Sequence, residues 1–287
     1  MASLKEVKGR IATVKNTRKI TSAMKMVASA KLHKAQVAIT HMLPYKERLH
    51  RIFTHFLSKE DVGSIYATER EVKRIALIVI SSNSSLCGGY NANVIKHATQ
   101  LLEKYQYLGK ENILVYPIGR KVSEALEKIG YVPQGDFQEM ANHPTFAEVA
   151  KLAQHLMDLY RTGKVDKVEI LYNHFKNMAT QILTHDVYLP IPLSGGTEET
   201  IHEEIDYIVE PSAKELLSML LPKVLRMNLY TVLLDSNASE HAARTMAMQI
   251  ATDNADELLQ ELTLMYNKTR QQAITNELLD IVGGTMA

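Results

Sequence analysis

The stretch MQIATDNADELLQELTLMYNKTRQQAITNELLDIV (residues 248–282) contains neither glycine nor proline. The whole run from Lys223 to Val282 shares this property, and at about 1.5 Å per residue it could form a helix roughly 90 Å long. Apolar residues recur in it at alternating spacings of three and four, as in a coiled-coil seam: Met248, Ala251, Ala255, Leu258, Leu262 and Met265. Such a stripe predicts a partner helix.

The N-terminal segment offers that partner. The same spacing recurs in two sets there: Leu4, Val7, Ile11 and Val14, then Ala35, Ala38, Met42, Tyr45, Leu49, Ile52 and Phe56. Between the sets the phase slips, which we interpret as a stutter that alters the supercoil, and Pro44 is expected to kink or loosen the helix. Charge favours pairing, because residues 1–34 hold nine Lys or Arg and one acid, whereas residues 235–287 hold eight acids and three bases.

Most glycines and prolines lie between residues 63 and 222, where strand-like and helix-like runs alternate. Buried parallel strands are expected at 74–80, 112–118 and 167–173, helices at 91–107, 119–130 and 145–161, edge strands at 181–189 and 203–210, and a flexible loop at 190–200. The sequence therefore predicts an α/β fold in three parts. Residues 1–60 and 211–287 form a long coiled coil, and residues 61–210 form a central Rossmann-like domain.

Composition narrows the class of protein. The chain is 46% hydrophobic with a formal net charge of +1, which gives no whole-chain attraction to nucleic acid. No apolar run approaches the roughly 18 residues of a membrane span, so none is expected. The single cysteine, Cys87, excludes an internal disulfide framework and is expected to be a buried thiol in a reducing cytoplasm.

The sequence contains no complete motif for nucleotide binding, metal binding or nucleophilic catalysis. SSNSSLCGGYN (81–91) lies between a predicted strand and a predicted helix, where an α/β domain would hold a phosphate, but it lacks both GxGxxG and GK[ST]. The eleven histidines show no metal-ligand spacing. SEH at 239–241 lies within the predicted long helix, where neighbours do not face one another, so it is not a catalytic triad. We expect no cofactor and no metal.

A basic strip runs along the N-terminal helix and comprises Lys15, Arg18, Lys19, Lys25, Lys31 and Lys34. Nucleic acid or an anionic membrane could bind such a strip, although no aromatic residues interleave with it. A solvated helix flank and an acidic protein partner are the other interpretations. The residues alone leave these open.

Three stretches resemble the gamma subunit of bacterial F-type ATP synthases: TRKITSAMKMVASAKLHKAQ (17–36), LCGGYN (86–91) and SEHAARTMAMQIATDNADELLQELTLMYNKTRQQAITNELLDIV (239–282). The similarity spans the chain and is most specific at the C-terminal end. Before LCGG the family usually has Asp, a basic residue and Gly, whereas this chain has Asn83, Ser84 and Ser85. The role of this loop is therefore open.

The resemblance implies an antiparallel pair of terminal helices that forms an asymmetric shaft inside a ring of three alpha and three beta subunits. The shaft would couple ion-driven rotation of a membrane c-subunit ring to ATP synthesis or hydrolysis at the beta subunits, without catalytic residues or a cofactor of its own. The central domain would meet the epsilon subunit and the c ring, as a peripheral protein on the cytoplasmic face of the bacterial inner membrane. Ring contacts are implied at Met24, Lys25, Arg244, Arg270, Gln271, Thr275, Glu277 and Asp280.

Two functions other than a rotary shaft are also compatible with the sequence. The chain could be a non-rotary coiled-coil tether that carries an α/β recognition domain, which would bind one partner stoichiometrically. It could also be a nucleotide-binding protein that uses the 81–91 loop. ATP binding to the isolated chain, abolished by changing Gly88 and Gly89, would favour the nucleotide-binding function.

Overall fold

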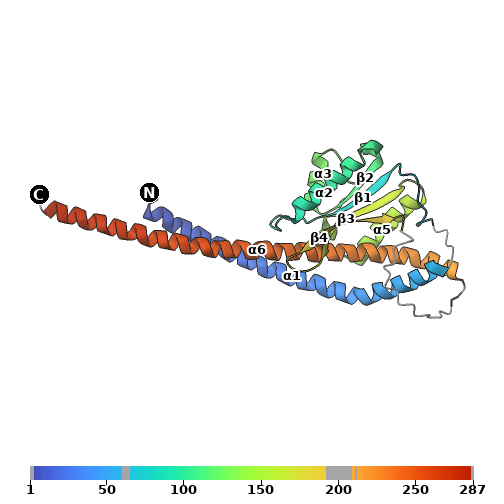
Figure 1. Ribbon diagram of the computed structural model, residues 1–287, viewed down its shortest axis with the longest axis horizontal. Helices are drawn as coiled ribbons and strands as arrows, with labels where there is room; N and C mark the ends of the chain where they lie inside the picture. The colour runs from blue at the N-terminus through green and yellow to red at the C-terminus, as the bar shows by residue number, and fades with distance from the viewer. Residues whose placement is uncertain (1–2, 60–64, 192–208, 211, 286–287) are drawn as a thin grey trace.

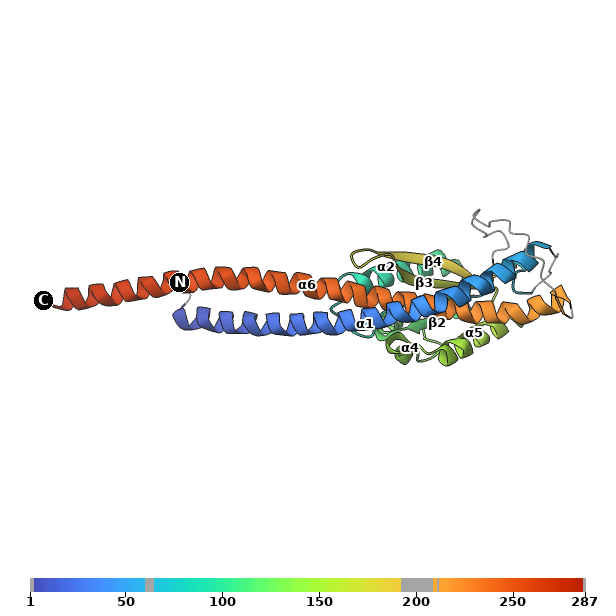
Figure 2. The same ribbon diagram turned by 90° about the horizontal axis from the view of Figure 1, so that it is seen from below.

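The computed structural model describes residues 3–59, 65–191, 209–210 and 212–285. Two long helices, α1 (Leu4–Lys59) and α6 (Ala213–Thr285), run antiparallel, and an α/β domain packs beside one end of the pair (Figures 1 and 2). The C-terminal end of α6 extends past the first turn of α1 as a single helix (Figure 1). The predicted fold class is confirmed.

The domain contains a four-stranded sheet in the order β2-β1-β3-β4. Strands β1 (Ile75–Ile80), β2 (Ile113–Ile118) and β3 (Lys167–Phe175) are parallel, and β4 (Gln181–Leu189) is an antiparallel edge strand. All four lie where the sequence predicts them. Of the predicted strand 203–210, residues 203–208 lie outside the described residues, and 209–210 are not in a strand. The predicted loop 190–200 lies outside them from residue 192.

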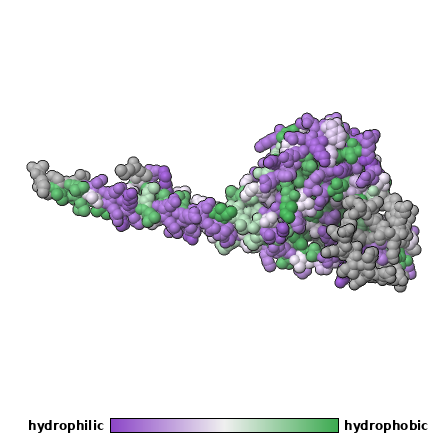
Figure 3. Space-filling model, in the orientation of Figure 1, coloured by the Kyte–Doolittle hydropathy of each residue, from purple (hydrophilic) through white to green (hydrophobic). Residues whose placement is uncertain are grey.

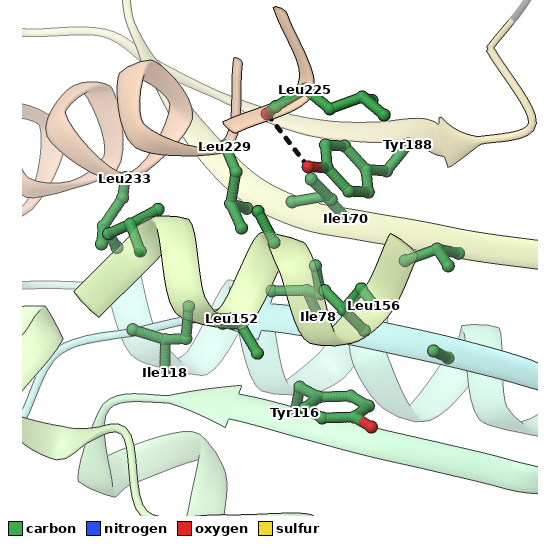
Figure 4. Close-up of a cluster of buried hydrophobic side chains, with 14 of the residues drawn as sticks. Ile78, Tyr116, Ile118, Leu152, Leu156, Ile170, Tyr188, Leu225, Leu229 and Leu233 are labelled. Atoms are coloured by element: carbon green, nitrogen blue, oxygen red, sulfur yellow. Dashed lines mark hydrogen bonds between the residues drawn. The ribbon is translucent and has the colours of Figure 1, made fainter. Parts of the chain in front are cut away.

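Helices cover both faces of the sheet because side chains of β1 alternate between two buried faces. One face, with Ile75, Leu77 and Val79, packs against α2 (Tyr90–Lys104) and α3 (Arg120–Lys128). The other face packs against α5 (Phe146–Arg161) and α6 (Figure 4). A short helix that the sequence did not predict, α4 (Gln138–Asn142), lies on this second side, and two 3₁₀ turns (Gln106–Leu108 and Lys110–Asn112) precede β2.

Helix α6 belongs to the domain and to the helix pair at once. Leu225, Leu229 and Leu233 pack into the core beneath the sheet, and the Tyr188 hydroxyl donates a 3.0 Å hydrogen bond to the Leu225 carbonyl (Figure 4). A few residues later, Ala238 and Ala242 are fully buried with Leu32 and Ala35 of α1. No flexible joint separates the core helix from the helix that extends to the C-terminus.

The seam between α1 and α6 corrects the predicted register. Every buried residue of α1 whose side chain is described falls in one unbroken heptad register: Val7, Thr21, Ala28, Leu32, Ala35, Leu49, Phe53 and Phe56. No stutter is present. Arg18, Thr21 and Lys25 occupy the register between the two apolar sets, so an apolar pattern could not reveal it. A strict seven-residue repeat imposes a left-handed supercoil, which keeps the seam facing the partner.

In two stretches, 35–56 and 248–265, every second predicted seam position was one residue early. Tyr45 is 52% exposed, and Phe53 rather than Ile52 is the buried partner of Leu49. On α6, Leu258 and Met265 are exposed, while Met248, Ala255 and Leu262 are buried as predicted. At most of these positions the residues three and four places after a seam residue are both apolar. The sequence therefore fits either spacing, and packing against the partner helix selects one.

The prolines do not interrupt the helices. Helix α1 continues through Pro44, and its end turns toward α6 beyond the middle of the domain (Figure 1). Helix α6 contains Pro222 and begins ten residues before the glycine- and proline-free run. There Leu217 and Leu221 pack against Phe53 and Phe56, which stabilises a turn that proline alone would weaken.

The sequence led us to expect no segment with the hydropathy of a membrane span, but α6 has that hydropathy. Among the described residues, α6 is the one helix that is long and apolar enough by composition to cross a membrane, and 44% of its 18-residue apolar window is buried inside the protein. That window includes part of the domain core, and core helices have this composition in proteins that span no membrane.

Candidate functional site

The segment after β1 occupies the place where open α/β sheets bind ligands. β1 lies between β2 and β3, so the carboxyl end of β1 is the point where the strand order reverses. Residues 81–89 leave the sheet there and lead into α2. We call this segment the switch loop. Its contacts decide whether the site is open to a ligand.

Oxygens of the switch loop fill the N-terminus of α3, the helix that follows the neighbouring strand β2. The Arg120 amide donates to Asn83 Oδ1 (2.8 Å), the Val122 amide to Ser81 Oγ (3.1 Å) and the Lys121 amide to the Ser82 carbonyl (3.2 Å). These donors would otherwise attract an anion. Internal partners therefore take the place of a phosphate.

Gly119 allows this close approach. Its φ is +106°, and a Cβ there would lie 2.3 Å from the Ser81 carbonyl oxygen, which no L residue could accommodate. The Ser81 amide donates to the Ile118 carbonyl at 2.8 Å, so the loop begins by pairing with the end of β2. The sequence requires glycine here to bring the two strand ends together, and the glycine creates no cavity.

The opposite side of the switch loop lies on α6. Arg244 Nη2 donates to Ser84 Oγ (2.8 Å) and approaches the carbonyl oxygens of Ser84 (3.3 Å) and Ser85 (3.4 Å). Arg244 Nη1 pairs with the Glu240 carboxylate one turn earlier on the helix. Beyond the loop, the Tyr90 hydroxyl shares a 2.8 Å hydrogen bond with Ser236 Oγ. The loop is thus bonded to the helix that leads to the C-terminus.

Within the switch loop, neighbouring side chains point in opposite directions. Cys87 is buried, as the sequence predicted, and Asn91 Nδ2 lies 3.2 Å from its sulfur. Leu86 is 59% exposed and has a φ of +69°, the left-handed conformation that non-glycine residues rarely adopt. The loop therefore has an anchored base and an exposed apolar apex.

Charged groups meet at this junction of α1, α6 and the switch loop. Burial raises the pKa of Glu240, although Arg244 and Lys31 oppose the shift. Burial lowers the pKa of His241 to about 4, helped by the positive charges of Arg244 and Lys31. His241 Nδ1 is buried and has no hydrogen-bond partner among the described residues. The imidazole is therefore neutral at pH 7.

A second polar cluster bonds the end of β3 to α6. Asp235 accepts hydrogen bonds from the Phe175 amide (3.0 Å) and His174 Nδ1 (2.6 Å), and Ser239 Oγ donates to the Asn173 carbonyl (2.9 Å). Ser239 and Glu240 thus have separate partners, and His241 Nδ1 has none among the described residues, so these three residues of α6 do not form a triad. The end of β3 is therefore bonded to α6.

Polar contacts also cross the seam between the two long helices. Thr21 Oγ1 lies 2.8 Å from Thr252 Oγ1, and Arg18 Nε lies 2.6 Å from the Asp256 carboxylate. The ion pair joins the basic strip to the acidic C-terminal helix, as the charge count predicted. Its two side chains are about half exposed, so it contributes at most about 1 kcal/mol.

The residues that the resemblance implied as ring contacts fall into three environments. Met24 and Lys25 are half-buried on α1. Arg244 has an 11% exposed side chain and is engaged by Glu240 and the switch loop. A third group is exposed on the C-terminal part of α6 and comprises Arg270, Gln271, Thr275 and Glu277. The Asp280 side chain lies outside the described residues.

Sequence reasoning did not find the partners of Arg244. Glu240 and Arg244 are four residues apart on a predicted helix, and that spacing could have indicated their ion pair. Ser84 gave no such signal, because 160 residues separate it from Arg244. Within the described part of the chain, no three His, Cys, Asp or Glu side chains are arranged to hold a metal ion.

Comparison with known proteins covers the full chain. The family model described as ATP synthase matches residues 3–287. The chain is 64% identical to the ATP synthase gamma chain of Phocaeicola vulgatus, with all of both chains covered. It is 46% identical to that of Flavobacterium johnsoniae, covering 100% of this chain and 99% of the relative.

Solved structures share the fold at lower identity. A chain in the structure of the Euglena gracilis mitochondrial ATP synthase OSCP/F1/c-ring, rotational state 3, has a TM-score of 0.63 and 17% identity, covering 99% of this chain and 93% of that one. A chain in the Tetrahymena thermophila mitochondrial central stalk and c-ring structure has a TM-score of 0.58 and 23% identity, covering 81% and 99%. These structures support the arrangement of two long helices and an α/β domain.

Proposed function

This chain belongs to the ATP synthase gamma-chain family, and from that premise we propose that it is a rotor shaft whose activity is turning rather than bond chemistry. One observation carries the proposal. Helix α6 is continuous over 73 residues, from the core of the α/β domain to a tip beyond α1. A torque applied to the domain therefore reaches the tip without crossing a loop.

The partners follow from this assignment. The paired helices, residues 1–60 and 211–287, would lie inside a ring of three alpha and three beta subunits, and residues 61–210 would meet the epsilon subunit and the c-subunit ring. The chain would act at the cytoplasmic face of a bacterial inner membrane without a span of its own. The beta subunits would hold the catalytic sites, so this chain needs no cofactor.

Exposed apolar side chains on the shaft support a surrounding protein partner. Ile274, Leu278, Leu279, Ile281 and Val282 are each about half exposed or more at the tip of α6. Farther along the shaft, Ile20, Met26 and Val27 are exposed on α1. In Figure 3, hydrophobic patches lie near the tip and on the shaft next to the domain, with hydrophilic surface between them. Soluble proteins rarely leave such surface without a partner.

An off-axis shaft would contact three identical catalytic subunits unequally. Each subunit then favours a different nucleotide affinity, because a contact made in one state and absent in another shifts the population. Reversing a site from mostly closed to mostly open needs a differential of about 5 kcal/mol. One surface ion pair cannot supply this, so the proposal requires many contacts acting together.

The basic strip on α1 is proposed to face acidic loops of the beta subunits during part of each turn. Its support is the charge count of nine bases to one acid over residues 1–34. Reversing Lys15, Lys19 and Lys34 together should reduce rotation-coupled ATP hydrolysis at low salt and have less effect at high salt. Unchanged coupling at low salt would contradict this role.

Direct observation of rotation tests the main proposal. Tyr107 is 73% exposed on the α/β domain and Cys87 is buried, so Tyr107→Cys gives a selective attachment point for a bead. In a complex immobilised through its beta subunits, ATP should drive the bead in one direction in steps. A tether would show Brownian motion without net rotation, and that result would favour the alternative function.

A further inference from the structure

We propose that Arg244 is a positioning residue that clamps the switch loop to the shaft, rather than a residue that contacts the ring directly. The inference rests on the proposed rotary function for its consequence, but the clamp itself rests on geometry. The guanidinium carries five N–H donors. Those of Nη1 and Nη2 are directed to Glu240, Ser84 and Ser85, all within this chain.

Burial favours this assignment over a direct contact. The side chains of Arg244 and Glu240 are 11% and 9% exposed, so each is the main partner of the other away from water. A ring subunit that attracted Arg244 would first have to break a buried ion pair, which is costly because it leaves Glu240 uncompensated. Arg270 is exposed on the same helix and has no such constraint.

The clamp acts on the exposed stretch of the switch loop, where the Ser84 carbonyl also accepts a 2.6 Å hydrogen bond from Ser82 Oγ. Asn83 is held on the domain side, with its Nδ2 donating to the Gln138 carbonyl at 2.7 Å, and Tyr90 is held by Ser236. Between these anchors, Ser84, Ser85 and Leu86 are exposed. Arg244 contacts the two residues just before Leu86, whose left-handed backbone costs free energy and persists only where its surroundings enforce it. Leu86 is therefore held as a fixed projection on the flank of the shaft.

Ser84 and Ser85 provide matched variants, because Arg244 reaches the Ser84 hydroxyl but only the backbone of Ser85. In the assembled complex, Ser84→Ala should accelerate hydrogen exchange of the amides at 84–89 by about tenfold, the expected effect of losing one hydrogen bond to a charged group. Ser85→Ala should leave exchange unchanged, and Ser84→Thr, which keeps the hydroxyl, should restore it. Equal exchange in Ser84→Ala and Ser85→Ala would overturn the clamp.

The ratio of ATP-driven ion pumping to ATP hydrolysis in membrane vesicles tests whether positioning matters. Ser84→Ala should lower this ratio without changing the melting temperature of the complex, while Ser85→Ala should match the wild type. Faster exchange with an unchanged ratio would overturn the positioning role. Failure of the wild-type complex to couple hydrolysis to pumping would overturn the proposed function instead, and would leave the exchange result on the clamp standing.

Discussion

Glu169 is a carboxylate 1% exposed in the middle of β3, and three side chains from different elements surround it. It accepts hydrogen bonds from the Tyr105 hydroxyl (2.6 Å), Lys167 Nζ (2.7 Å) and His185 Nε2 (2.9 Å). Burial alone would raise its pKa, but the hydrogen bonds outweigh burial and lower the pKa to about 2. The carboxylate therefore bonds β3 and β4 to the end of α2.

Replacing this carboxylate should destabilise the domain. Glu169→Gln is expected to lower the free energy of unfolding by about 3 kcal/mol, because Lys167 loses its anionic partner. The folded pKa is depressed below the ordinary 4.5, so the stabilisation is present above pH 4.5 and is lost as the pH falls toward 2. Urea unfolding at pH 7 and pH 3 measures both effects. The exposed Glu103→Gln on α2 is the control, and an equal loss in both variants would contradict the assignment.

His241 should make the junction sensitive to mild acid. Below about pH 6.5 the unfolded chain binds a proton that the folded chain refuses until about pH 4, so stability falls as the pH drops through that window. Each unit of pKa difference corresponds to about 1.4 kcal/mol. The melting temperature of His241→Met should fall less between pH 7 and pH 5 than that of the wild type.

A matched histidine variant separates this effect from general acid instability. His143 is exposed at the end of α4, and His143→Met should keep the wild-type dependence of melting temperature on pH. If His241→Met and His143→Met behave alike, the buried imidazole is not the cause.

Helices α1 and α6 pack through a seam whose central side chains are small and partly polar. Ala28, Ala35, Ala238 and Ala242 are buried there, and small side chains let helix axes approach closely. The Thr21–Thr252 hydrogen bond lies beside this section. Such a polar pair in a seam specifies register, because any shift along the helix breaks the bond between the two hydroxyls and leaves each bonded only to a carbonyl of its own helix.

Single and double substitutions can isolate that pair. Thr21→Val should cost about 1 kcal/mol in urea unfolding, because Thr252 loses its hydrogen bond to α1, while the double variant with Thr252→Val should cost less than the sum of the two single variants. Thr13→Val at an exposed position of α1 controls for helix propensity. Strictly additive costs would show that the hydroxyls do not interact.

Helices and strands were predictable from the sequence where their signal lies in neighbouring residues. The buried runs of β1 to β3 and the helices α2, α3 and α5 were found because apolar periodicity and glycine positions are local signals. The seam register at Ile39 and Phe53 was not, since an adjacent apolar residue allows two spacings, and at Lys46 the seam position itself carries a charged residue. The bond from Arg244 to Ser84 was also beyond reach, because only the folded chain brings the switch loop onto α6.

At the scale of the whole molecule, the exposed surface is unevenly distributed. Exposed apolar side chains gather at the tip of α6, whereas the α/β domain has a buried core on both sides of the sheet. The isolated chain therefore presents a hydrophobic end that the assembled complex would cover.

This surface predicts concentration-dependent self-association of the purified chain. Replacing Leu278 and Ile281 together with Gln should shift the weight-average mass from light scattering toward the monomer, because about half of each side chain or more is exposed. Val132→Gln removes an exposed apolar residue from the domain and should have no such effect. Association that is unchanged by the tip variant would assign it to another surface.

Helix α6 follows the rest of the α/β domain in the sequence, and this order has a consequence for biosynthesis. A ribosome completes α1 and all four strands before it makes Leu225, Leu229 and Leu233, which close the core beneath the sheet. At 5–20 residues per second, the first helix waits on the order of ten seconds or more for the last one. During that time the nascent chain exposes the part of the sheet that α6 will cover and the apolar stripe of α1, so shielding of these surfaces by chaperones should reduce aggregation until α6 has been made.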